Sequence, residues 1–423
     1  MSTRAPMRIS RSWTASTGIL RADGGGGDRA DVAQPPSLPG WRVRHGRVGG
    51  RGQNRDMATA SSAALRAARL SSHGLREPVG SAASVVERLM AVQAQDLAAA
   101  KWAVGSRVPG STVADIDAML EQRQVVRSWP VRGTLHLVPA RMLRPILALT
   151  GARELGRAAL RHRRLELGAE EYRIARDTAE RLLAGGGSAS REQLLAAWDA
   201  AGCETAGQRG YHLIWWLALD GVLACGPVEG RTQRFVLLDE WAPAASDAPI
   251  GREATLGELF AGYVAGHGPV TLRDFAWWTG LTLGDAKAAL AAAGDRVERF
   301  PGDDAERFAA PGAADAARHR PSGALALAAF DEYFLGYADR SAVCDPRHHD
   351  RVIPGGNGVF QPVLVVDGRV IGTWRRAGRA DRPRVELEVF EAASDALIRR
   401  LTRPLTAWAR FHGAQLEGVE RRA

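Results

Sequence analysis

Apolar residues recur at helical spacing in the first folded part of the chain. The pattern starts near Leu65 and predicts further helices over 83–90 and 97–104. Thr112 can cap a helix that reaches Leu120, because a threonine hydroxyl accepts hydrogen bonds from free first-turn amides. The chain therefore opens its folded part with several short helices.

Strand-like residues follow these helices. The segments 125–129 and 132–138 are short, alternating and rich in β-branched residues, and Pro130-Val131 lies between them. This pattern predicts a β-hairpin with its turn around Pro130-Val131. Helices followed by a hairpin indicate a winged helix.

The same order recurs in the next hundred residues. A capping box at 190–193 predicts a helix start, and 210–219 reads as a second, aromatic-rich helix. The segments 222–225 and 234–238 then predict a second hairpin.

A third helical unit follows. Helical spacing begins at Thr255 and is interrupted at 268–269, after which Thr271 caps a new helix that ends at Gly280. Thr282 caps the next one. Helix, short break and helix is the order of a helix-turn-helix motif.

The last hundred residues change from helical to strand-like patterns. Asp367-Gly368 is a strong two-residue hairpin turn, and an amphipathic helix is predicted over about 392–411. The predicted strands are 325–330, 363–366, 370–374 and 385–390.

These patterns predict an α+β protein that is mainly α. We expect three tandem winged-helix units followed by a hairpin-rich C-terminal α+β part. The expected divisions are a basic N-terminal tail over 1–56, winged-helix units over 57–150, 151–245 and 246–320, and the C-terminal part over 321–423.

The charge changes how the tail is interpreted. The chain of 423 residues has a net charge of +9, and residues 1–56 hold ten arginines and four aspartates, which accounts for +6 of it. The tail lacks sustained apolar periodicity and contains glycine and proline runs, so we predict that it is disordered or that the true start is Met57. A basic overall charge is therefore weak evidence for a nucleic-acid partner, because most of it lies in the tail.

Other composition features exclude several classes. Hydrophobic residues make up 45% of the chain, but no segment approaches about 18 uninterrupted apolar residues, and none forms a signal-peptide core. Cys203, Cys225 and Cys344 are few and widely spaced, which fits a reducing compartment. We expect a cytoplasmic protein, associated with the nucleoid, that has no membrane partner.

Five groups of residues together resemble one protein family. They are Val92-Gln93-Ala94-Gln95-Asp96, the run 127–137 (RSWPVRGTLHL), Asp220-Gly221-Val222-Leu223, 268–271 (GPVT) with 277–281 (WWTGL), and Phe330-Asp331-Glu332-Tyr333. In this order they are similar to the bacterial winged-helix DNA-binding family that includes the AlkZ/YcaQ-type DNA glycosylases, over about residues 60–415. The resemblance implies tandem winged-helix units that face DNA, and excision of alkylated purines.

The resemblance also points to candidate catalytic residues. Those glycosylases place a Gln-x-Gln or Gln-x-Asp motif at the lesion, and Gln93-Ala94-Gln95 matches the first form, with a small residue at the usually aliphatic middle position. Residues i and i+2 face the same way only in extended chain. If the segment is extended or turned, the two carboxamides could hold one water. The alternative is that both glutamines satisfy a helix end.

A carboxamide is a poor base, so such a site suits a leaving group that is already activated, as a cationic N-alkylated purine is. Asp96 could stabilise the developing sugar cation. His136 could contact phosphate, orient the nucleotide or relay a proton, and it shares a strand face with Thr134. The alternative for His136 is an edge-strand histidine whose hydrogen bonds are satisfied by the local backbone.

Arg127 and Arg132 lie on the predicted hairpin, where guanidinium groups could contact phosphates, with Thr134 beside them. An ordinary solvated wing would look similar. Trp215-Trp216 and Trp277-Trp278 could stack on bases, but adjacent helical residues face different ways, so one of each pair is expected in the core.

Two acidic or histidine-rich groups complete the candidates. Asp331-Glu332 could be a carboxylate pair for acid/base work or a hydrogen-bonding element at a strand end. The group 348–350 (HHD) lacks paired ligands at defined spacing, so we predict no metal, and no phosphate loop or nucleotide fingerprint predicts a cofactor.

The sequence therefore predicts a monofunctional DNA N-glycosylase acting on alkylated purines, bulky or crosslinked ones included, in double-stranded DNA. The catalytic candidates are Gln93, Gln95, Asp96 and His136, and the DNA-binding candidates are Arg127, Arg132 and Thr134. The alternative is a non-enzymatic winged-helix DNA-binding protein or transcriptional regulator. A third possibility is that the C-terminal part binds a protein or small molecule.

Overall fold

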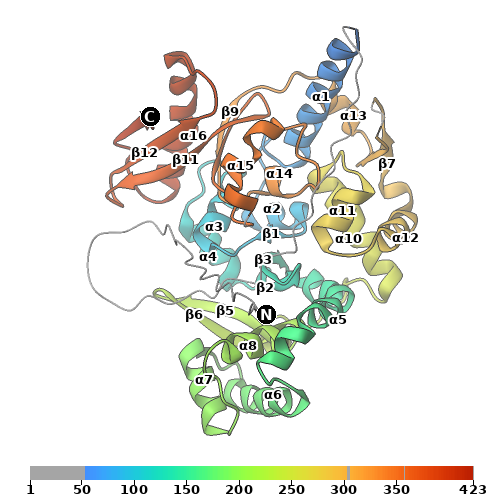
Figure 1. Ribbon diagram of the computed structural model, residues 1–423, viewed down its shortest axis with the longest axis vertical. Helices are drawn as coiled ribbons and strands as arrows, with labels where there is room; N and C mark the ends of the chain where they lie inside the picture. The colour runs from blue at the N-terminus through green and yellow to red at the C-terminus, as the bar shows by residue number, and fades with distance from the viewer. Residues whose placement is uncertain (1–52, 303–304, 357, 423) are drawn as a thin grey trace, which may run out of the picture. The chain divides into compact units, whose positions relative to one another are not determined.

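The computed structural model describes residues 53–302, 305–356 and 358–422 (Figure 1). It is a mixture of helices and sheets, which confirms the predicted α+β class. Most of the predicted N-terminal tail lies outside the described residues. Helix α1 begins at Gln53, so the last four positions of the predicted tail lie in this helix.

The first part of the chain alternates helices and short strands. Its elements are α1 (Gln53–Ser72), α2 (Ala82–Leu89), β1 (Val92–Gln93), α3 (Leu97–Gly105), α4 (Val113–Glu121), β2 (Val125–Val131) and β3 (Thr134–Pro139).

The second part begins with a long helix that the sequence analysis did not predict. Its elements are α5 (Ala140–Arg164), α6 (Ala169–Leu183), β4 (Ala189–Ser190), α7 (Arg191–Ala200), α8 (Arg209–Leu219), β5 (Leu223–Glu229), β6 (Thr232–Leu237) and α9 (Leu238–Trp241). Helix α5 continues through residue 150, where the sequence analysis divides the first two units.

The third part is helical and ends in a two-stranded sheet. Its elements are α10 (Arg252–His267), α11 (Leu272–Thr279), α12 (Leu283–Ala293), the 3-10 turn η1 (Gly294–Arg296), β7 (Glu298–Phe300), β8 (Arg307–Ala309) and α13 (Ala313–Ala317).

The C-terminal part carries a second large sheet. Its elements are β9 (Ala324–Leu327), α14 (Glu332–Leu335), η2 (Pro346–His348), α15 (His349–Val352), η3 (Pro354–Gly356), β10 (Val363–Val366), β11 (Arg369–Gly378), β12 (Pro383–Val389), α16 (Asp395–Phe411) and β13 (Gly418–Arg421).

Predicted helix starts are confirmed where a capping side chain is present. The hydroxyls of Ser190, Thr271 and Thr282 accept hydrogen bonds from the amides three residues later, at 3.0–3.2 Å. At Thr112, the Asp115 carboxylate accepts from the Thr112 amide at 2.7 Å. These contacts satisfy donors that the helix itself leaves free.

The two predicted hairpins belong to one sheet. The strand order is β1-β3-β2-β5-β6-β4, and the junction is an antiparallel pairing between Arg127 of β2 and Cys225 of β5. The sequence predicts the two hairpins as separate wings. Local strand patterns carry no information about which strand edges meet, so this junction is a new finding.

The turn of the first hairpin differs from the prediction. It lies at Arg132-Gly133, both with positive φ (51° and 65°), and β2 continues through Pro130 to Val131. A two-residue turn with two positive φ values matches the twist of the flanking strands. Arg132 therefore lies in the turn rather than in a strand.

The C-terminal sheet has the order β13-β12-β11-β10-β9. Asp367 and Gly368 both have positive φ between β10 and β11, which confirms the predicted hairpin turn. Strand β9 ends at Leu327, three residues earlier than predicted, and Phe330 has a φ of 60°. Strand β13 pairs parallel to β12 and was not predicted.

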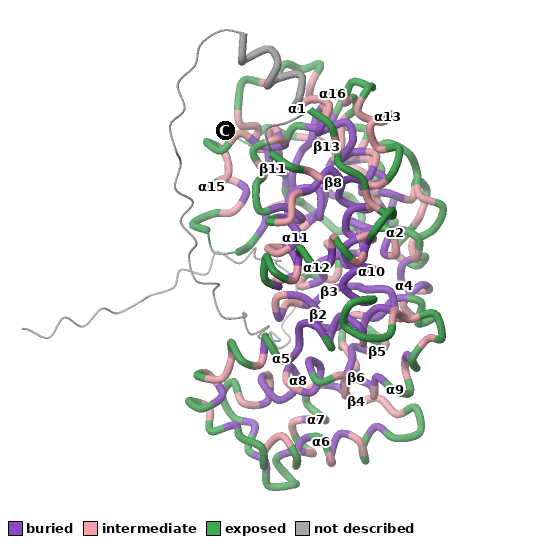
Figure 2. Tube along the Cα trace, turned by 90° about the vertical axis from the view of Figure 1, so that its right-hand side faces the viewer, coloured by how far each residue is buried: buried purple, intermediate pink, exposed green. Residues whose placement is uncertain are grey.

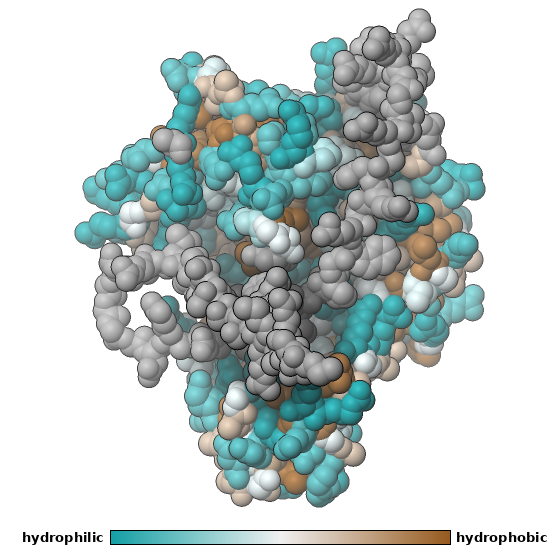
Figure 3. All heavy atoms as spheres, in the orientation of Figure 1, coloured by the Kyte–Doolittle hydropathy of each residue, from teal (hydrophilic) through white to brown (hydrophobic). Residues whose placement is uncertain are grey.

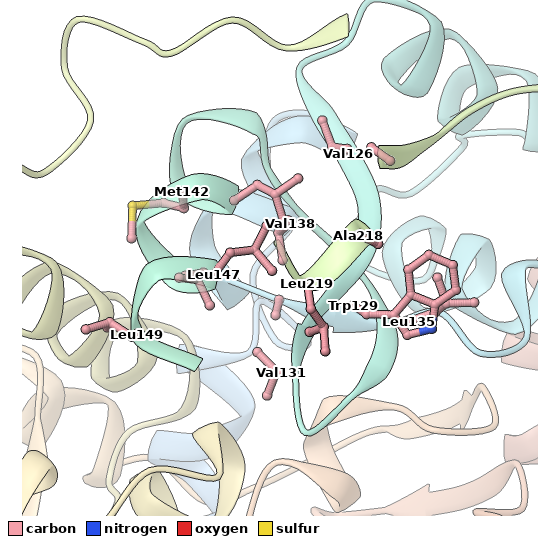
Figure 4. Packing of buried hydrophobic residues seen from close by; sticks show 14 of the residues in the cluster. Val126, Trp129, Val131, Leu135, Val138, Met142, Leu147, Leu149, Ala218 and Leu219 are labelled. Carbon is pink, nitrogen blue, oxygen red and sulfur yellow. The ribbon is translucent and has the colours of Figure 1, made fainter. Parts of the chain in front are cut away.

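Buried side chains bind these parts together. The main cluster combines residues of the six-stranded sheet, α5, α8, α10 and α11. In Figure 4 its side chains from β2, β3, α5 and α8 pack against one another, namely Val126, Trp129, Val131, Leu135, Val138, Met142, Leu147, Leu149, Ala218 and Leu219. A second cluster joins α2, α3 and α4 to the C-terminal sheet and α16. The first part of the chain thus contributes to both cores.

Burial varies along the structure. Buried residues are concentrated around β2 and β3, whereas α6 and α7 carry many exposed positions (Figure 2). The face drawn in Figure 3 is mainly hydrophilic, with small apolar areas between polar side chains. None of the described helices is long and apolar enough to cross a membrane.

Candidate active site

Gln93 lies at the end of the short edge strand β1 and is 7% exposed. Its direct partner on β3 is His136. Cross-strand partners present their side chains on the same face of a sheet, so Gln93 and His136 are neighbours there. The segment is extended, which is the condition under which the sequence analysis expected Gln93 to serve as a site residue.

A closed set of hydrogen bonds holds Gln93. Its main-chain amide donates to Glu332 Oε1 at 3.2 Å, and its side-chain Oε1 accepts from Arg132 Nη2 at 3.2 Å. Trp278 completes the circuit, because its Nε1 donates to Glu332 Oε2 at 3.0 Å and its carbonyl accepts from Arg132 Nη1. We call Gln93, Arg132, Trp278 and Glu332 the clamp.

Gln95 is attached to the same hairpin at a different point. Its Oε1 accepts a hydrogen bond from the Leu135 amide at 3.3 Å, and the adjacent Ala94 amide donates to the Leu135 carbonyl at 2.7 Å. Both glutamines therefore use their carboxamide oxygens on protein donors. Each oxygen keeps a second lone pair, and each NH2 group remains oriented away from its anchor.

Glu332 is fully buried at the first position of α14. Besides its two bonds in the clamp, its Oε2 lies 3.3 Å from His267 Nε2. Burial on its own raises the pKa of a carboxyl group, but the hydrogen bond and charge of His267, followed by the charges of His136 and Arg132, bring the pKa of Glu332 below its ordinary value. The carboxylate form is thus favoured in spite of burial.

His267 connects this carboxylate to α10. Its Nδ1 lies 3.2 Å from the Tyr263 carbonyl, and its Nε2 faces Glu332 Oε2.

His136 is fully buried and neutral near pH 7. Its Nδ1 donates to the Thr134 carbonyl at 2.8 Å. Burial, assisted by the positive charge of Arg132, lowers the pKa of His136 to about 4. Its Nε2 therefore carries a lone pair, and it has no hydrogen-bond partner among the described residues. Ser128 lies directly across from His136 on β2, and its buried hydroxyl also has no hydrogen-bond partner among the described residues.

The three predicted DNA-binding residues are tied to the protein. Arg127 donates to the Ala94 carbonyl (2.9 Å from Nη2) and to Gln233 Oε1 (2.9 Å from Nη1), so it links the two hairpins. Arg132 belongs to the clamp, and burial lowers its pKa. The Thr134 hydroxyl donates to the Val131 carbonyl at 3.2 Å, within the turn. These contacts give each residue a role in holding the site.

Asp96 is exposed and caps α3. Its Oδ1 accepts from the Ala99 amide at 3.0 Å. The buried carboxylate next to Gln93 is instead Glu332, which is 239 positions away in the sequence. The sequence offers Glu332 and Asp331 as a candidate carboxylate pair, but no local pattern indicates the contact of Glu332 with Gln93.

Asp331 and Glu332 are adjacent but have different partners. Asp331 is buried and forms a two-pronged ion pair with Arg107, with both N–O distances at 2.9 Å. It also caps α14 by accepting from the Tyr333 amide. The two carboxylates therefore do not act as one pair.

The tryptophan pairs divide as the sequence predicts. Trp215 and Trp278 are buried, whereas Trp216 and Trp277 are half-buried. The guanidinium groups of Arg132 and Arg340 lie 4.9 Å and 4.7 Å from the centre of the Trp277 ring, which is cation–π distance. Trp277 is thus held beside the clamp by charge rather than left free.

A second Gln-x-Gln sequence lies nearby in the chain. Gln122 and Gln124 flank Arg123 between α4 and β2, and both are exposed. The pattern of residues is the same as at Gln93 and Gln95. Burial and the clamp distinguish the first pair from the second, and neither can be read from residue type.

The sequence of residues 86–411 matches the family described as DNA glycosylase AlkZ-like. The chain belongs to this family. A curated relative, the interstrand DNA cross-link repair glycosylase of Streptomyces sahachiroi, is 28% identical over 316 residues, which cover 70% of this chain and 82% of the relative. The structure of the Streptomyces sahachiroi DNA glycosylase AlkZ is similar in fold, with a TM-score of 0.71 at 22% identity, over 86% of this chain and 99% of that one.

This AlkZ-like protein is therefore an enzyme of the DNA glycosylase class, as the sequence analysis predicts. The matched range contains the whole clamp, since Gln93, Arg132, Trp278 and Glu332 all lie within 86–411.

Proposed function

We propose that this AlkZ-like glycosylase hydrolyses the N-glycosidic bond of alkylated purines, with the attacking water held by Gln93 and Gln95. The observation that carries the proposal is the anchoring of both carboxamide oxygens, on Arg132 and on the Leu135 amide. Anchored carboxamides have a fixed orientation, so they can direct both a donor and an acceptor at one water without reorganisation.

Excision of an N-alkylated purine can be carried out by weak bases such as the carboxamides of Gln93 and Gln95. In an N-alkylated purine the leaving base is cationic, so the electron pair of the breaking C1′–N bond neutralises it on departure. The water oxygen forms the new bond to C1′, and one water proton is released. The site has to position water and tolerate a sugar cation, and it does not have to supply a strong acid.

We infer that His136 accepts a hydrogen bond from the water or the nucleotide through Nε2. The support is its neutral form, its fixed Nδ1 contact and the absence of any partner for Nε2 among the described residues. A group with a pKa near 4 is a weak base, so its contribution is orientation of the water more than removal of its proton.

Exposed arginines near the site support a double-stranded DNA partner. Arg153, Arg157 and Arg164 lie at helical spacing on the exposed face of α5, over roughly 16 Å of helix. Arg157 also donates to the Gly280 carbonyl at 3.1 Å, just after Trp278 in the chain. Such a row suits contacts with successive phosphates of one strand.

We also propose the three winged-helix units. Helices precede a hairpin three times, at β2–β3, β5–β6 and β7–β8, and the third hairpin was not placed by the sequence analysis. The divisions 57–150, 151–245 and 246–320 remain part of this proposal, as does an association with the nucleoid. The name of the Streptomyces relative makes crosslinked DNA a substrate to include in any test.

The test is base release from a panel of duplexes that carry N7-methylguanine, N3-methyladenine or a nitrogen-mustard interstrand crosslink. The double variant Gln93→Ala, Gln95→Ala should lose at least 100-fold in single-turnover release while duplex affinity stays within about threefold. The matched control is Gln122→Ala, Gln124→Ala, which removes the exposed pair and should release base at the wild-type rate.

Two results would overturn the proposal. One is equal loss in both double variants, which would mean that Gln93 and Gln95 have no special role. The other is wild-type protein that binds duplex yet releases no base from any substrate in the panel. A marked preference for one undamaged sequence over random DNA would then favour a regulator.

A further inference from the structure

Burial of the Glu332 carboxylate is energetically unfavourable. A buried carboxylate loses its hydration, and an apolar side chain of similar size at such a position is often neutral or stabilising. Asp331, the preceding residue, has an evident fold-holding role through its two-pronged pair with Arg107 and its cap of α14. Among the described residues, Glu332 forms no ion pair with an arginine and caps no helix, and its two oxygens face the Gln93 amide, the Trp278 indole and His267.

The contacts of Glu332 join segments that are distant in sequence. Its Oε1 accepts from the Gln93 amide of β1, and its Oε2 accepts from the Trp278 indole of α11 and faces His267 of α10. Glu332 therefore links the strand that carries the Gln-x-Gln motif to two helices of the third part of the chain.

The other half of the clamp acts on the side chain of Gln93. Arg132 donates to the carboxamide oxygen and to the Trp278 carbonyl. Trp278 thus touches Glu332 with its indole and Arg132 with its carbonyl. The main chain of Gln93 and its carboxamide are fixed by two arms that share one residue.

We propose that Glu332 is a positioning residue for base excision, which fixes the main chain of Gln93 so that the Arg132-held carboxamide points in one direction. This inference rests on the proposed function of Gln93. Glu332 does not touch the reacting atoms; it acts through the Gln93 amide.

The variant Glu332→Gln tests the proposal with little change of shape. A carboxamide has one acceptor oxygen where a carboxylate has two, so either the Gln93 amide or the Trp278 indole must face an NH2 group. The matched control is Asp331→Asn. It replaces the buried carboxylate one position earlier in the chain with a carboxamide and changes no residue of the clamp. Glu332→Ala removes both acceptors and is used for hydrogen exchange.

The rate measurement uses the duplex of the panel that the wild-type protein excises fastest. Glu332→Gln should lower the single-turnover rate 10- to 100-fold with duplex affinity within twofold, at a temperature where each variant is folded. Asp331→Asn should lower the melting temperature but keep the rate within twofold of wild type. A wild-type rate in Glu332→Gln, or an equal loss in Asp331→Asn, overturns the proposal.

Hydrogen exchange gives a readout that needs no substrate. The Gln93 amide should exchange at least tenfold faster in Glu332→Ala than in wild type, and within twofold of wild type in Asp331→Asn. Unchanged exchange in Glu332→Ala overturns the positioning role. If no duplex is excised by the wild-type protein, the proposed function fails, and the exchange measurement still decides whether Glu332 holds Gln93.

Discussion

The hairpins β2–β3 and β5–β6 belong to the same sheet and were predicted from the same kind of pattern, but they have opposite surroundings. Nearly every residue of β2 and β3 is buried, and the turn residue Arg132 is held by Gln93 and Trp278. The outer half of β5–β6 is exposed, including the turn residue Arg231.

The difference shows that the helices packed against a hairpin, and not its own strand pattern, decide whether its turn belongs to the candidate site. The first turn meets side chains of α8 and α11, as in the hydrogen bond from Trp215 Nε1 to the Gly133 carbonyl at 3.2 Å. The second turn extends away from such contacts, and a β-carbon at Gly230 would have no neighbour within 4 Å. Arginine in the first turn orders the site, and arginine in the second is available to solvent or DNA.

Exchanging the two turn arginines for alanine gives the largest expected contrast. Arg132→Ala removes one arm of the clamp, so base release should fall at least tenfold and the free energy of unfolding by about 2–3 kcal/mol, as for loss of charged hydrogen bonds. Arg231→Ala should change stability by less than about 0.5 kcal/mol. Single-turnover kinetics and urea titrations measure both.

The exposed arginine has its own expected signature. If the second turn contacts phosphate, Arg231→Ala should reduce the slope of log affinity against log salt by about 1 and leave the rate of bound substrate unchanged. Similar losses of base release in the two variants would contradict the division between the hairpins.

The two hairpins should also differ in how their stability depends on pH. His136 faces Ser128 across the first hairpin, whereas Phe235 faces Cys225 across the second. Burial and the charge of Arg132 lower the pKa of His136 to about 4, so the unfolded chain takes up a proton near pH 6.5 before the folded protein does. Stability from this residue is therefore present above pH 6.5 and lost as the pH falls towards 4.

The variant His136→Phe measures that contribution. Relative to wild type, its free energy of unfolding should improve by about 2 kcal/mol between pH 7 and pH 5, because phenylalanine takes up no proton. Urea titrations at the two pH values give the difference. A constant difference between the proteins would mean that His136 titrates normally in the folded state.

The two turn glycines provide the smallest and most closely matched contrast. Gly133 and Gly230 have φ values of 65° and 63°, so alanine is strained at both positions by about 1 kcal/mol. A β-carbon at Gly133 would also lie 3.1 Å from Trp215 Cζ2, whereas none is crowded at Gly230. We expect Gly133→Ala to cost about 2–3 kcal/mol and Gly230→Ala about 1 kcal/mol in thermal or urea unfolding. Equal losses would remove packing as the cause.

Local signals in the sequence predicted most of the elements. Capping at Ser190, Thr271 and Thr282 and the turn at Asp367-Gly368 follow from interactions within four residues, so a local pattern contains them. The junction of the two hairpins and the parallel pairing of β13 depend on strand edges that meet across long stretches of chain. No local periodicity encodes those pairings.

The candidate site could be predicted only in part, because some of its contacts also join segments that are distant in the sequence. Gln93 and Gln95 were selected because a resemblance pointed to them, and His136 because of its residue type and its face on a predicted strand. The structure brings Gln93 and His136 into one cross-strand pair. Glu332 was predicted as one half of a candidate carboxylate pair with Asp331, and Trp278 as a candidate core residue. Their role in the clamp arises from contacts across more than fifty positions, which composition and spacing do not reveal.

The junction between Arg127 and Cys225 has a mechanical consequence. Because β2 and β5 share one sheet, the exposed outer half of the second hairpin is tied through main-chain pairing to the strand that lies opposite His136. A movement of the outer turn is therefore transmitted to the buried hairpin through the backbone of the sheet.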